Sequence, residues 1–239
     1  MKRFVVCGLL PVSLSVLVFV CGAGARGRAD VLKQRERSTV SLELELTKKN
    51  ANGLQRLVSL LTGVNAYATG FFVGDRLVLT AYHAVSGELD SSKKLALGFG
   101  RDDELEARAF VGGCQARILG VDKDADLALL EICSARQTET PTFQLNVSKD
   151  EKLLLIARPR GDKIISYGTF SGAYNFRGLE YWSAKLSARD GFSGSPVYNE
   201  HGELVGVFSG YDWSQKLAVI SPGDRAQKLV AQYAGTSGP

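Results

Sequence analysis

Three short segments of the chain carry side chains that could do nucleophilic chemistry. His83 ends one apolar run, Asp126 begins another, and Ser193 stands in the glycine-rich segment 190–196. Taken alone, each has an ordinary structural explanation: a hydrogen-bonded core histidine, an acid of a polar turn, or a glycine–serine turn. Asp126 differs from its neighbouring acids because it directly precedes Leu127, which draws its carboxylate toward the interior, where it needs a donor.

Together the three residue types form the parts of an activated nucleophile. A serine hydroxyl is a poor nucleophile at neutral pH, so Ser193 needs a base that accepts its proton during attack. His83 suits that role because an imidazole titrates near neutral pH and has two distinct nitrogens. Asp126 would keep the second nitrogen protonated and stabilise the imidazolium that forms. The pattern therefore predicts a catalytic group of His83, Asp126 and Ser193.

Two glycines beside Ser193 fit a further requirement of acyl transfer. Gly191 and Gly194 let the backbone turn sharply. Such a turn brings backbone N–H groups together at the position of a developing oxyanion. We expect the N–H groups of Gly191 and Ser193 to form this oxyanion hole.

The three segments also carry a family resemblance. Leu-Thr-Ala-x-His83, Asp126-Leu-Ala-Leu-Leu and Gly191-x-Ser193-Gly-Ser-Pro follow one another in this order. They resemble the chymotrypsin-like (trypsin-fold) serine proteases, especially compact bacterial secreted members and the protease domain of the HtrA/Deg family. The resemblance extends over about residues 65–235. The chain order Ser, acid, His of the α/β-hydrolase esterases is not present.

The resemblance implies an all-β fold of two packed six-stranded antiparallel β-barrels with a C-terminal helix. The dominant hydrophobic period of two, with turn residues at short intervals, independently favours an all-β sandwich or barrel. The expected protease domain covers residues 65–239. Its N-terminal barrel (about 65–140) would supply His83 and Asp126, and its C-terminal barrel (about 150–221) would supply Ser193. A helix is expected over 222–234, with Ser221 as its cap and Pro222 as its first residue.

By the same resemblance, the chain is a serine endopeptidase that hydrolyses proteins or peptides through an acyl-enzyme, without a cofactor. The alternative is a catalytically silent binding or scaffold protein that keeps the fold. The complete set of catalytic residue types favours the enzyme, because a binding protein has no chemical need for all of them. The sequence leaves the oligomeric state open.

The resemblance also places the primary specificity pocket. Ser187 would form its base, with Ala188 beside it and Ser209, Gly210 and Tyr211 along one wall. An aspartate at the base would pair with Lys or Arg substrates, and Ser187 is neutral. We therefore expect a small or medium apolar substrate side chain, because an uncharged pocket discriminates chiefly by size.

The first residues read as a targeting segment. Lys2 and Arg3 precede the uncharged stretch 4–25, which ends in Ala23-Gly24-Ala25, the small-x-small form that a signal peptidase accepts. Residues 1–25 are therefore interpreted as a cleaved signal peptide, and the chain as secreted or periplasmic with no stable membrane span afterwards. An uncleaved membrane anchor is the alternative, because the apolar run approaches the ~20 residues that span a bilayer.

Residues 26–64 are expected to form an N-terminal lead-in, either a propeptide or a structural arm. Residues 26–39 are basic and polar, which predicts a flexible segment. Apolar residues then alternate over 40–46 as in a strand. A helical face is predicted over 54–61, where apolar residues recur at helical spacing.

Composition limits the remaining classes of function. The chain has 239 residues, 29 Lys+Arg against 25 Asp+Glu and 45% apolar residues, so it can bury a core in one large domain or two small ones. The basic residues are scattered among nearly as many acids, which gives no nucleic-acid signal.

Two cysteines remain once the signal peptide is removed. If the strand-like runs on either side of residues 122–125 form a hairpin symmetric about residues 123 and 124, Cys114 and Cys133 lie opposite each other. Antiparallel pairing permits a disulfide there without requiring it, so a disulfide and two buried free thiols both remain open. The two histidines, His83 and His201, and these cysteines lack the close spacings of a metal site.

Overall fold

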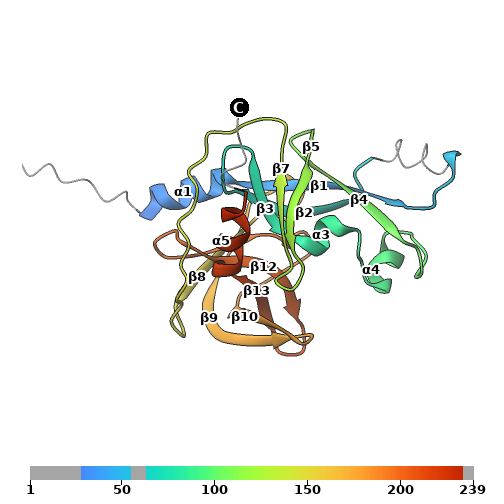
Figure 1. Ribbon diagram of the computed structural model, residues 1–239. Coiled ribbons are helices and arrows are strands. Elements are labelled where there is room, and N and C mark those ends of the chain that lie inside the picture. The colour runs from blue at the N-terminus through green and yellow to red at the C-terminus, as the bar shows by residue number, and fades with distance from the viewer. Residues whose placement is uncertain (1–27, 55–62, 234–239) are drawn as a thin grey trace, which may run out of the picture.

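Two antiparallel β-structures form the body of the chain (Figure 1). The computed structural model describes residues 28–54 and 63–233. The N-terminal half contains α1 (Arg28–Ser38), β1 (Thr39–Lys48), β2 (Ala66–Phe72), β3 (Leu77–Ala81), α3 (Tyr82–Ser86), α4 (Ser91–Ala96), β4 (Leu105–Val111), β5 (Cys114–Gln115), β6 (Arg117–Asp122) and β7 (Leu127–Glu131). The C-terminal half contains β8 (Lys152–Ala157), the 3₁₀ turn η1 (Pro159–Gly161), β9 (Ile164–Phe176), β10 (Leu179–Lys185), β11 (Pro196–Asn199), β12 (Leu204–Asp212), β13 (Leu217–Pro222) and α5 (Gly223–Ala231).

The first β-structure is a sheet in the order β5-β4-β1-β2-β3-β7-β6. Its two edge strands, β5 and β6, are separated only by Ala116. The sheet therefore curls until both of its edges lie on one stretch of chain, in place of the closed six-stranded barrel that the resemblance implies. The departure has a local cause: the β5–β6 stretch pairs with β4 at its start and with β7 afterwards, so one bent strand serves as both edges.

The second β-structure is a closed barrel in the order β10-β13-β12-β11-β8-β9. Its strands occupy the lower part of Figure 1, below the first sheet. The expected all-β fold with a C-terminal helix is thus confirmed. The period-two pattern arises where a strand buries one face, as in β1, where Val40, Leu42, Leu44 and Leu46 are all buried.

One apolar cluster joins the two β-structures. It contains Leu79 and Leu127 from the first sheet, Ile156 and Val207 from the barrel, and Leu229 from α5. Figure 1 shows α5 beside both β-structures, and the helix covers the boundary where they pack together. Because this contact is apolar and buried, it fixes the position of one β-structure relative to the other.

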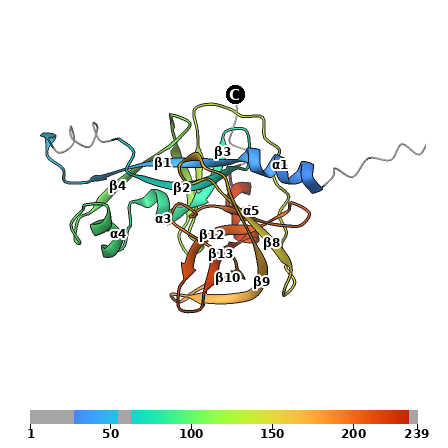
Figure 2. The ribbon, with the colours of Figure 1, turned by 180° about the vertical axis from the view of Figure 1, so that it is seen from behind.

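The N-terminal segment is more ordered than the sequence indicates. Residues 28–38 form helix α1 in place of the expected flexible segment, and Figure 2 shows α1 running straight into β1. Hydrophobic periodicity misses α1 because its anchor is polar: the buried Arg35 side chain bonds to two carbonyls of the body. The strand expected at 40–46 is present as β1, and it pairs with both β2 and β4. The first sheet therefore begins before residue 65.

Two further expectations concern the ends of the chain. The signal segment 1–25 and most of the helix expected at 54–61 lie outside the described residues. α5 begins at Gly223 with Pro222 as its N-cap, and no side chain caps it. Ser221 does not cap the helix because it belongs to β13, where it pairs with Val207.

Cys114 and Cys133 are joined by a disulfide with an S–S distance of 2.08 Å. The sequence suggested a hairpin symmetric about residues 123 and 124, but the hairpin in the structure does not have this symmetry. The pair Asp122–Leu127 beside the turn centres the hairpin between residues 124 and 125, and the register shifts once more at a bulge between Ile118 and Gly120. Cys114 lies on β5, which pairs with β4, and the disulfide ties that short edge strand to Cys133, two residues after the end of β7.

Within residues 28–54 and 63–233, no helix is long and apolar enough to cross a membrane.

Candidate active site

His83 is placed by a short helix on a rigid strand. Every residue of β3 is buried, and α3 follows it without a connecting loop. The N–H of Tyr82, the residue before His83, donates to the carbonyl of Asp126 at 3.0 Å. A backbone hydrogen bond alone thus attaches the segment of His83 to the turn that carries Asp126.

Asp126 occupies the turn between β6 and β7 in an unusual backbone conformation. Its φ is 53°, in the left-handed region that few non-glycine residues adopt. The Asp122 carboxylate accepts the N–H of Ala125 at 3.1 Å and fixes the residue before it. Asp126 itself is 8% exposed, so its carboxylate is withdrawn from water and depends on local donors.

Ser193 lies on the loop between β10 and β11, which we call the nucleophile loop (residues 187–195). Gly191 and Gly194 both have a φ of 84°, which other residues rarely adopt. At Gly194 a side chain is also excluded sterically, because a Cβ would overlap Thr80 Oγ1 and the carbonyl of Thr69. The loop can therefore pass this close to the first sheet only with glycine at this position.

The structure brings the three candidate catalytic residues together. His83 Nδ1 lies 2.7 Å from Asp126 Oδ2, and His83 Nε2 lies 2.9 Å from Ser193 Oγ. The histidine follows β3 and the aspartate precedes β7 of the first sheet, whereas the serine lies between β10 and β11 of the barrel. Both ring nitrogens are within hydrogen-bond reach of their partners, the arrangement in which an imidazole relays a proton from a hydroxyl.

Ser209 completes the surroundings of the acid. β12 has a register shift between Phe208 and Gly210, which leaves Ser209 out of the ladder, and its hydroxyl donates to Asp126 Oδ2. Bulges commonly redirect a side chain in this way. Nearby, burial and the charge of Asp126 raise the pKa of Tyr181.

The two expected oxyanion donors are free. Among the described residues, neither the N–H of Gly191 nor that of Ser193 donates a hydrogen bond, whereas the N–H of Phe192 between them donates to Arg189 O at 3.2 Å. A buried or half-buried N–H without a partner is uncommon unless a ligand fills its place. The loop thus offers two donors at the candidate nucleophile.

Thr69, on β2, holds this loop from the opposite side. Its N–H donates to Ser193 O at 2.9 Å, and its Oγ1 donates to Gly191 O at 2.8 Å. Its own carbonyl accepts the hydroxyl of Thr80 at 2.7 Å. Thr69 is fully buried, so these bonds are shielded from water and well defined.

The five expected pocket residues have different surroundings in the structure. Ala188 and Tyr211 pack against the same apolar cluster, and a Cβ on Gly210 would meet nothing within 4 Å. Ser187 is bound to Ser166, since its N–H donates to Ser166 Oγ at 3.1 Å and the two hydroxyls lie 2.8 Å apart. Ser209, expected along one wall, donates its hydroxyl to Asp126 Oδ2 and so contacts the acid.

Sequence reasoning missed the contact of Thr69 with the nucleophile loop and that of Ser209, which it named only as a pocket residue, with Asp126. Thr69 stands in an apolar strand segment and Ser209 follows one, so neither carries a local signal for its role. Their roles arise from the docking of the two β-structures and from a bulge. The described part of the chain contains no group of three or more His, Cys, Asp and Glu residues that could hold a metal ion.

Solved structures of two bacterial proteases have a fold similar to that of this chain. The active form of the Rv3671c protease of M. tuberculosis matches with a TM-score of 0.62 and 16% identity, over 100% of this chain and 96% of that one. The serine endoprotease of Yersinia pestis matches with a TM-score of 0.57 and 17% identity, over 86% of this chain and 65% of that one. No curated protein sequence matches the chain. At these identities the likeness shows that the chain shares the fold of these proteases.

The sequence itself carries the family assignment. Residues 68–207 match the family model described as "Trypsin-like peptidase domain", and this range holds all three candidate catalytic residues. The match covers more than half of the chain, which therefore belongs to the trypsin-like peptidase family of serine endopeptidases.

Proposed function

We propose that the chain cleaves peptide bonds with Ser193 as nucleophile, His83 as general base and Asp126 as the acid that orients it. The observation that carries the proposal is the bridging position of His83, 2.9 Å from Ser193 Oγ and 2.7 Å from Asp126 Oδ2. This geometry allows one imidazole to accept the serine proton while its other nitrogen remains protonated.

The first chemical step forms an acyl-enzyme. Ser193 Oγ attacks the substrate carbonyl while His83 Nε2 takes the hydroxyl proton, and the same proton then passes to the leaving amine. Asp126 stabilises the imidazolium and stays ionised throughout. Its donors suit that role, because Ser209 and the backbone N–H of His83 both bind the carboxylate.

The free N–H groups of Gly191 and Ser193 would bind the oxyanion of the tetrahedral intermediate. Each such donor typically contributes about 3 kcal/mol to transition-state stabilisation, because it is already oriented when charge develops. In the second half of the reaction, His83 activates a water that attacks the acyl-enzyme, and the carboxylic acid product leaves with Ser193 restored.

A neutral residue at the site of cleavage is the proposed preference. None of the five expected pocket residues is charged, and the hydroxyl of Ser187 is already paired with that of Ser166. An unpaired Lys or Arg side chain would be costly in such a pocket. Profiling of a peptide library would show cleavage after small or medium apolar residues, and equal cleavage after Lys or Arg would contradict this assignment.

We also propose that the protein works outside the cytoplasm, secreted or in a periplasm. The N-terminal segment has the composition of a signal peptide, and the Cys114–Cys133 disulfide is a bond that persists in oxidising compartments. Fractionation of the source cells, with N-terminal sequencing of the recovered protein, tests this. A mature N-terminus after Ala25 is the expected result.

Labelling by a fluorophosphonate probe tests the catalytic proposal. The wild-type protein should be labelled and should hydrolyse a peptide substrate, and both signals should be lost in Ser193→Ala. Ser195→Ala is the matched control, because Ser195 lies two residues away and is fully buried. A wild-type protein that is folded but neither labelled nor active would instead support the binding or scaffold function.

A further inference from the structure

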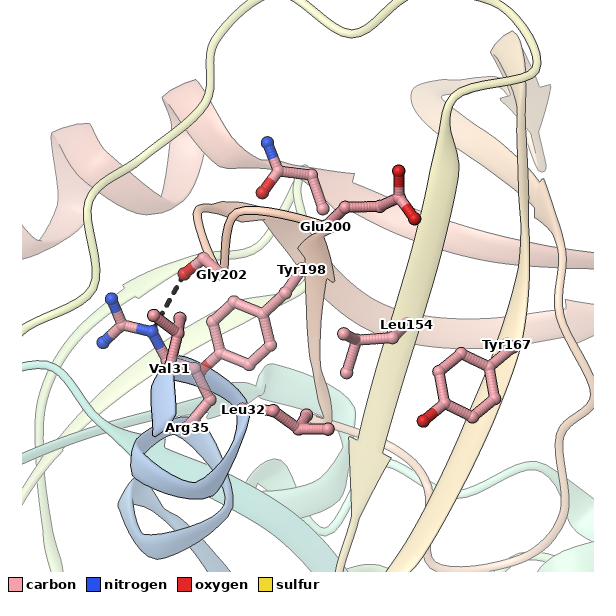
Figure 3. Close-up of a pocket in the computed structure, with 9 residues that line it drawn as sticks. Val31, Leu32, Arg35, Leu154, Tyr167, Tyr198, Glu200 and Gly202 are labelled. Carbon is pink, nitrogen blue, oxygen red and sulfur yellow. Dashed lines mark hydrogen bonds between the residues drawn. The ribbon is translucent and has the colours of Figure 1, made fainter. Parts of the chain in front are cut away.

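Helix α1 is attached to the body at its C-terminal end by Arg35. The Nε of Arg35 donates to Gly202 O at 2.9 Å, its Nη1 donates to Glu139 O at 3.2 Å, and its guanidinium lies 5.7 Å from the ring centroid of Tyr198. Figure 3 shows Val31, Leu32 and Arg35 of α1 turned toward Tyr198 and Gly202. Arg35 is only 7% exposed, so this docking is a buried, directed contact.

The end of α1 also binds the segment 158–163, which we call the linker loop. Nη2 of Arg158 donates to the carbonyl of Glu36 at 3.0 Å, and Lys163 Nζ lies 2.8 Å from the Glu36 carboxylate. The carbonyl of Glu36 is one of the last in the helix and lacks a helical partner. A guanidinium is favourable there because it also faces the negative end of the helix dipole.

The other side of the linker loop touches the nucleophile loop. The N–H of Arg158 donates to Thr69 Oγ1 at 3.0 Å, and the same oxygen donates to Gly191 O at 2.8 Å. Pro159 packs on Gly191 so closely that a Cβ there would come within 2.6 Å of the proline Cβ. Thr69 therefore holds the peptide group between Gly191 and Phe192, which lies between the two expected oxyanion donors. Pro159 packs against Gly191 itself.

Further contacts keep the linker loop in place against the first sheet. The guanidinium of Arg160 lies 5.3 Å from the ring centroid of Tyr67 on β2. Arg160 itself has a φ of 53°, a conformation that persists only when its surroundings fix it. The linker loop is thus bound on three sides: by α1, by β2 and by the nucleophile loop.

We propose that α1 is a positioning element of the active site, and that Arg158 and Thr69 are the positioning residues that connect it to the oxyanion hole. Docking of α1 holds Arg158, whose backbone orients the Thr69 hydroxyl, and this hydroxyl fixes the carbonyl of Gly191. The N-terminal segment thereby sets the rate of the chemical step. This inference rests on the proposed function, because it concerns the same oxyanion donors.

Steady-state kinetics of Arg158→Ala and Lys163→Ala test the proposal. Both variants remove a cation bound to Glu36, but Lys163 touches neither Thr69 nor Gly191. Arg158→Ala should lower kcat about tenfold with KM within about twofold, because part of the stabilisation given by the oxyanion donors is lost. Lys163→Ala should keep both constants. Equal effects of the two variants, or a rise in KM alone, would overturn the inference.

A peptide boronate gives a second readout, because one of its oxygens takes the oxyanion position. Its affinity should fall in Arg158→Ala by the same factor as kcat, while that of the matched peptide carboxamide stays constant. Thr69→Val should show a larger loss, since it leaves the N–H of Arg158 and the carbonyl of Gly191 unpaired. Thr69→Ser, which keeps the hydroxyl, should restore most of it. A Thr69→Ser variant as impaired as Thr69→Val would oppose the role of the hydroxyl.

Hydrogen exchange separates failure of this inference from failure of the proposed function. Amide exchange of residues 187–195 can be measured in a catalytically silent protein as well. It should accelerate in Arg158→Ala and in Arg35→Ala, and the double variant should exchange no faster than Arg35→Ala alone, because both act through α1. Unchanged exchange in both single variants would contradict the inference even if Ser193 proves to be the nucleophile.

Discussion

Asp126 holds His83 by two separate hydrogen bonds. Its Oδ1 accepts the backbone N–H of His83 at 2.8 Å, and its Oδ2 lies 2.7 Å from the ring nitrogen Nδ1. The first bond fixes where the histidine sits, and the second fixes which way its ring faces. A carboxylate is the only side chain of this size that accepts both, because an amide has a single acceptor oxygen.

Asp126→Asn separates these two effects. The amide oxygen can still accept the backbone N–H, but the amide nitrogen then faces Nδ1 and favours the wrong tautomer of His83. We expect kcat to fall about ten-thousandfold, with little change in thermal unfolding. Stopped assays at high enzyme concentration and circular dichroism measure the two quantities. A loss of kcat below about tenfold would mean that another group orients the imidazole.

Ser209→Ala removes one donor from the same carboxylate. Hydrogen bonds to a charged group contribute about 1.5–3 kcal/mol, so we expect kcat/KM to fall by at least tenfold. Ser214→Ala is the matched control, because Ser214 also donates to a carboxylate, that of Asp212, at the end of the same strand. Similar kinetics for both variants would show that the contact between Ser209 and Asp126 is not used in catalysis.

Gly194→Ala should destabilise the fold, because its Cβ would overlap Thr80 and Thr69. Gly178 is a suitable control: its φ of 83° matches the 84° of Gly194, but an added Cβ would meet nothing within 4 Å. We expect about 1 kcal/mol of destabilisation for Gly178→Ala from backbone strain. Gly194→Ala should cost about 1–3 kcal/mol more from overpacking. Urea unfolding of both variants gives the difference, and equal losses would disprove the steric argument.

The catalytic residue types could be predicted from the sequence because their chemistry is local. His83, Asp126 and Ser193 each belong to a short segment whose polar residue interrupts an apolar or glycine-rich pattern. The glycines at 191 and 194 were predictable for the same reason, since sharp turns require them. The roles of these residues in catalysis remain proposals that the variants above test.

What could not be predicted depends on long-range contacts. Helix α1 has no apolar stripe, and the carbonyls that accept from Arg35 lie more than a hundred residues away in the sequence. The register shifts at Leu119 and Ser209 follow from packing of the strands, and periodicity alone does not locate such bulges. The bond between Thr69 and Gly191 exists only after the two β-structures dock.

The turn between β12 and β13 should show acid-dependent stability through Asp212. The hydroxyls of Ser214 and Tyr174, with the N–H of Gln215, lower the pKa of Asp212 from 3.8 to about 2. Because the folded value lies below the ordinary one, the carboxylate stabilises the fold fully above about pH 4, and this contribution is lost as the pH falls toward 2.

Asp212→Asn should therefore be less stable than the wild type at pH 6, and the difference in urea midpoint should shrink between pH 4 and 2. Tyr174→Phe, which removes one donor, should show a smaller difference over the same interval. A difference that stays constant from pH 6 to pH 2 would show that the ionised form of Asp212 is not preferentially stabilised in the folded chain.

Arg225 and Asp122 join α5 to the turn that carries the acid. The guanidinium binds the carboxylate through two bonds, Nε to Oδ2 at 2.8 Å and Nη2 to Oδ1 at 2.6 Å. Both side chains are partly exposed, at 37% and 20%, so solvent screens the pair. We expect a coupling free energy of about 1 kcal/mol from a double-mutant cycle of Asp122→Ala and Arg225→Ala, measured by urea unfolding.

The same cycle should separate stability from catalysis. Asp122 also accepts the N–H of Ala125, the residue before Asp126, whereas Arg225 reaches this turn through the Asp122 carboxylate. Asp122→Ala should therefore lower kcat severalfold because it loosens the turn that orients Asp126, while Arg225→Ala should leave kcat within about twofold of the wild type. If both variants lower kcat equally, the C-terminal helix rather than the turn controls the position of the acid.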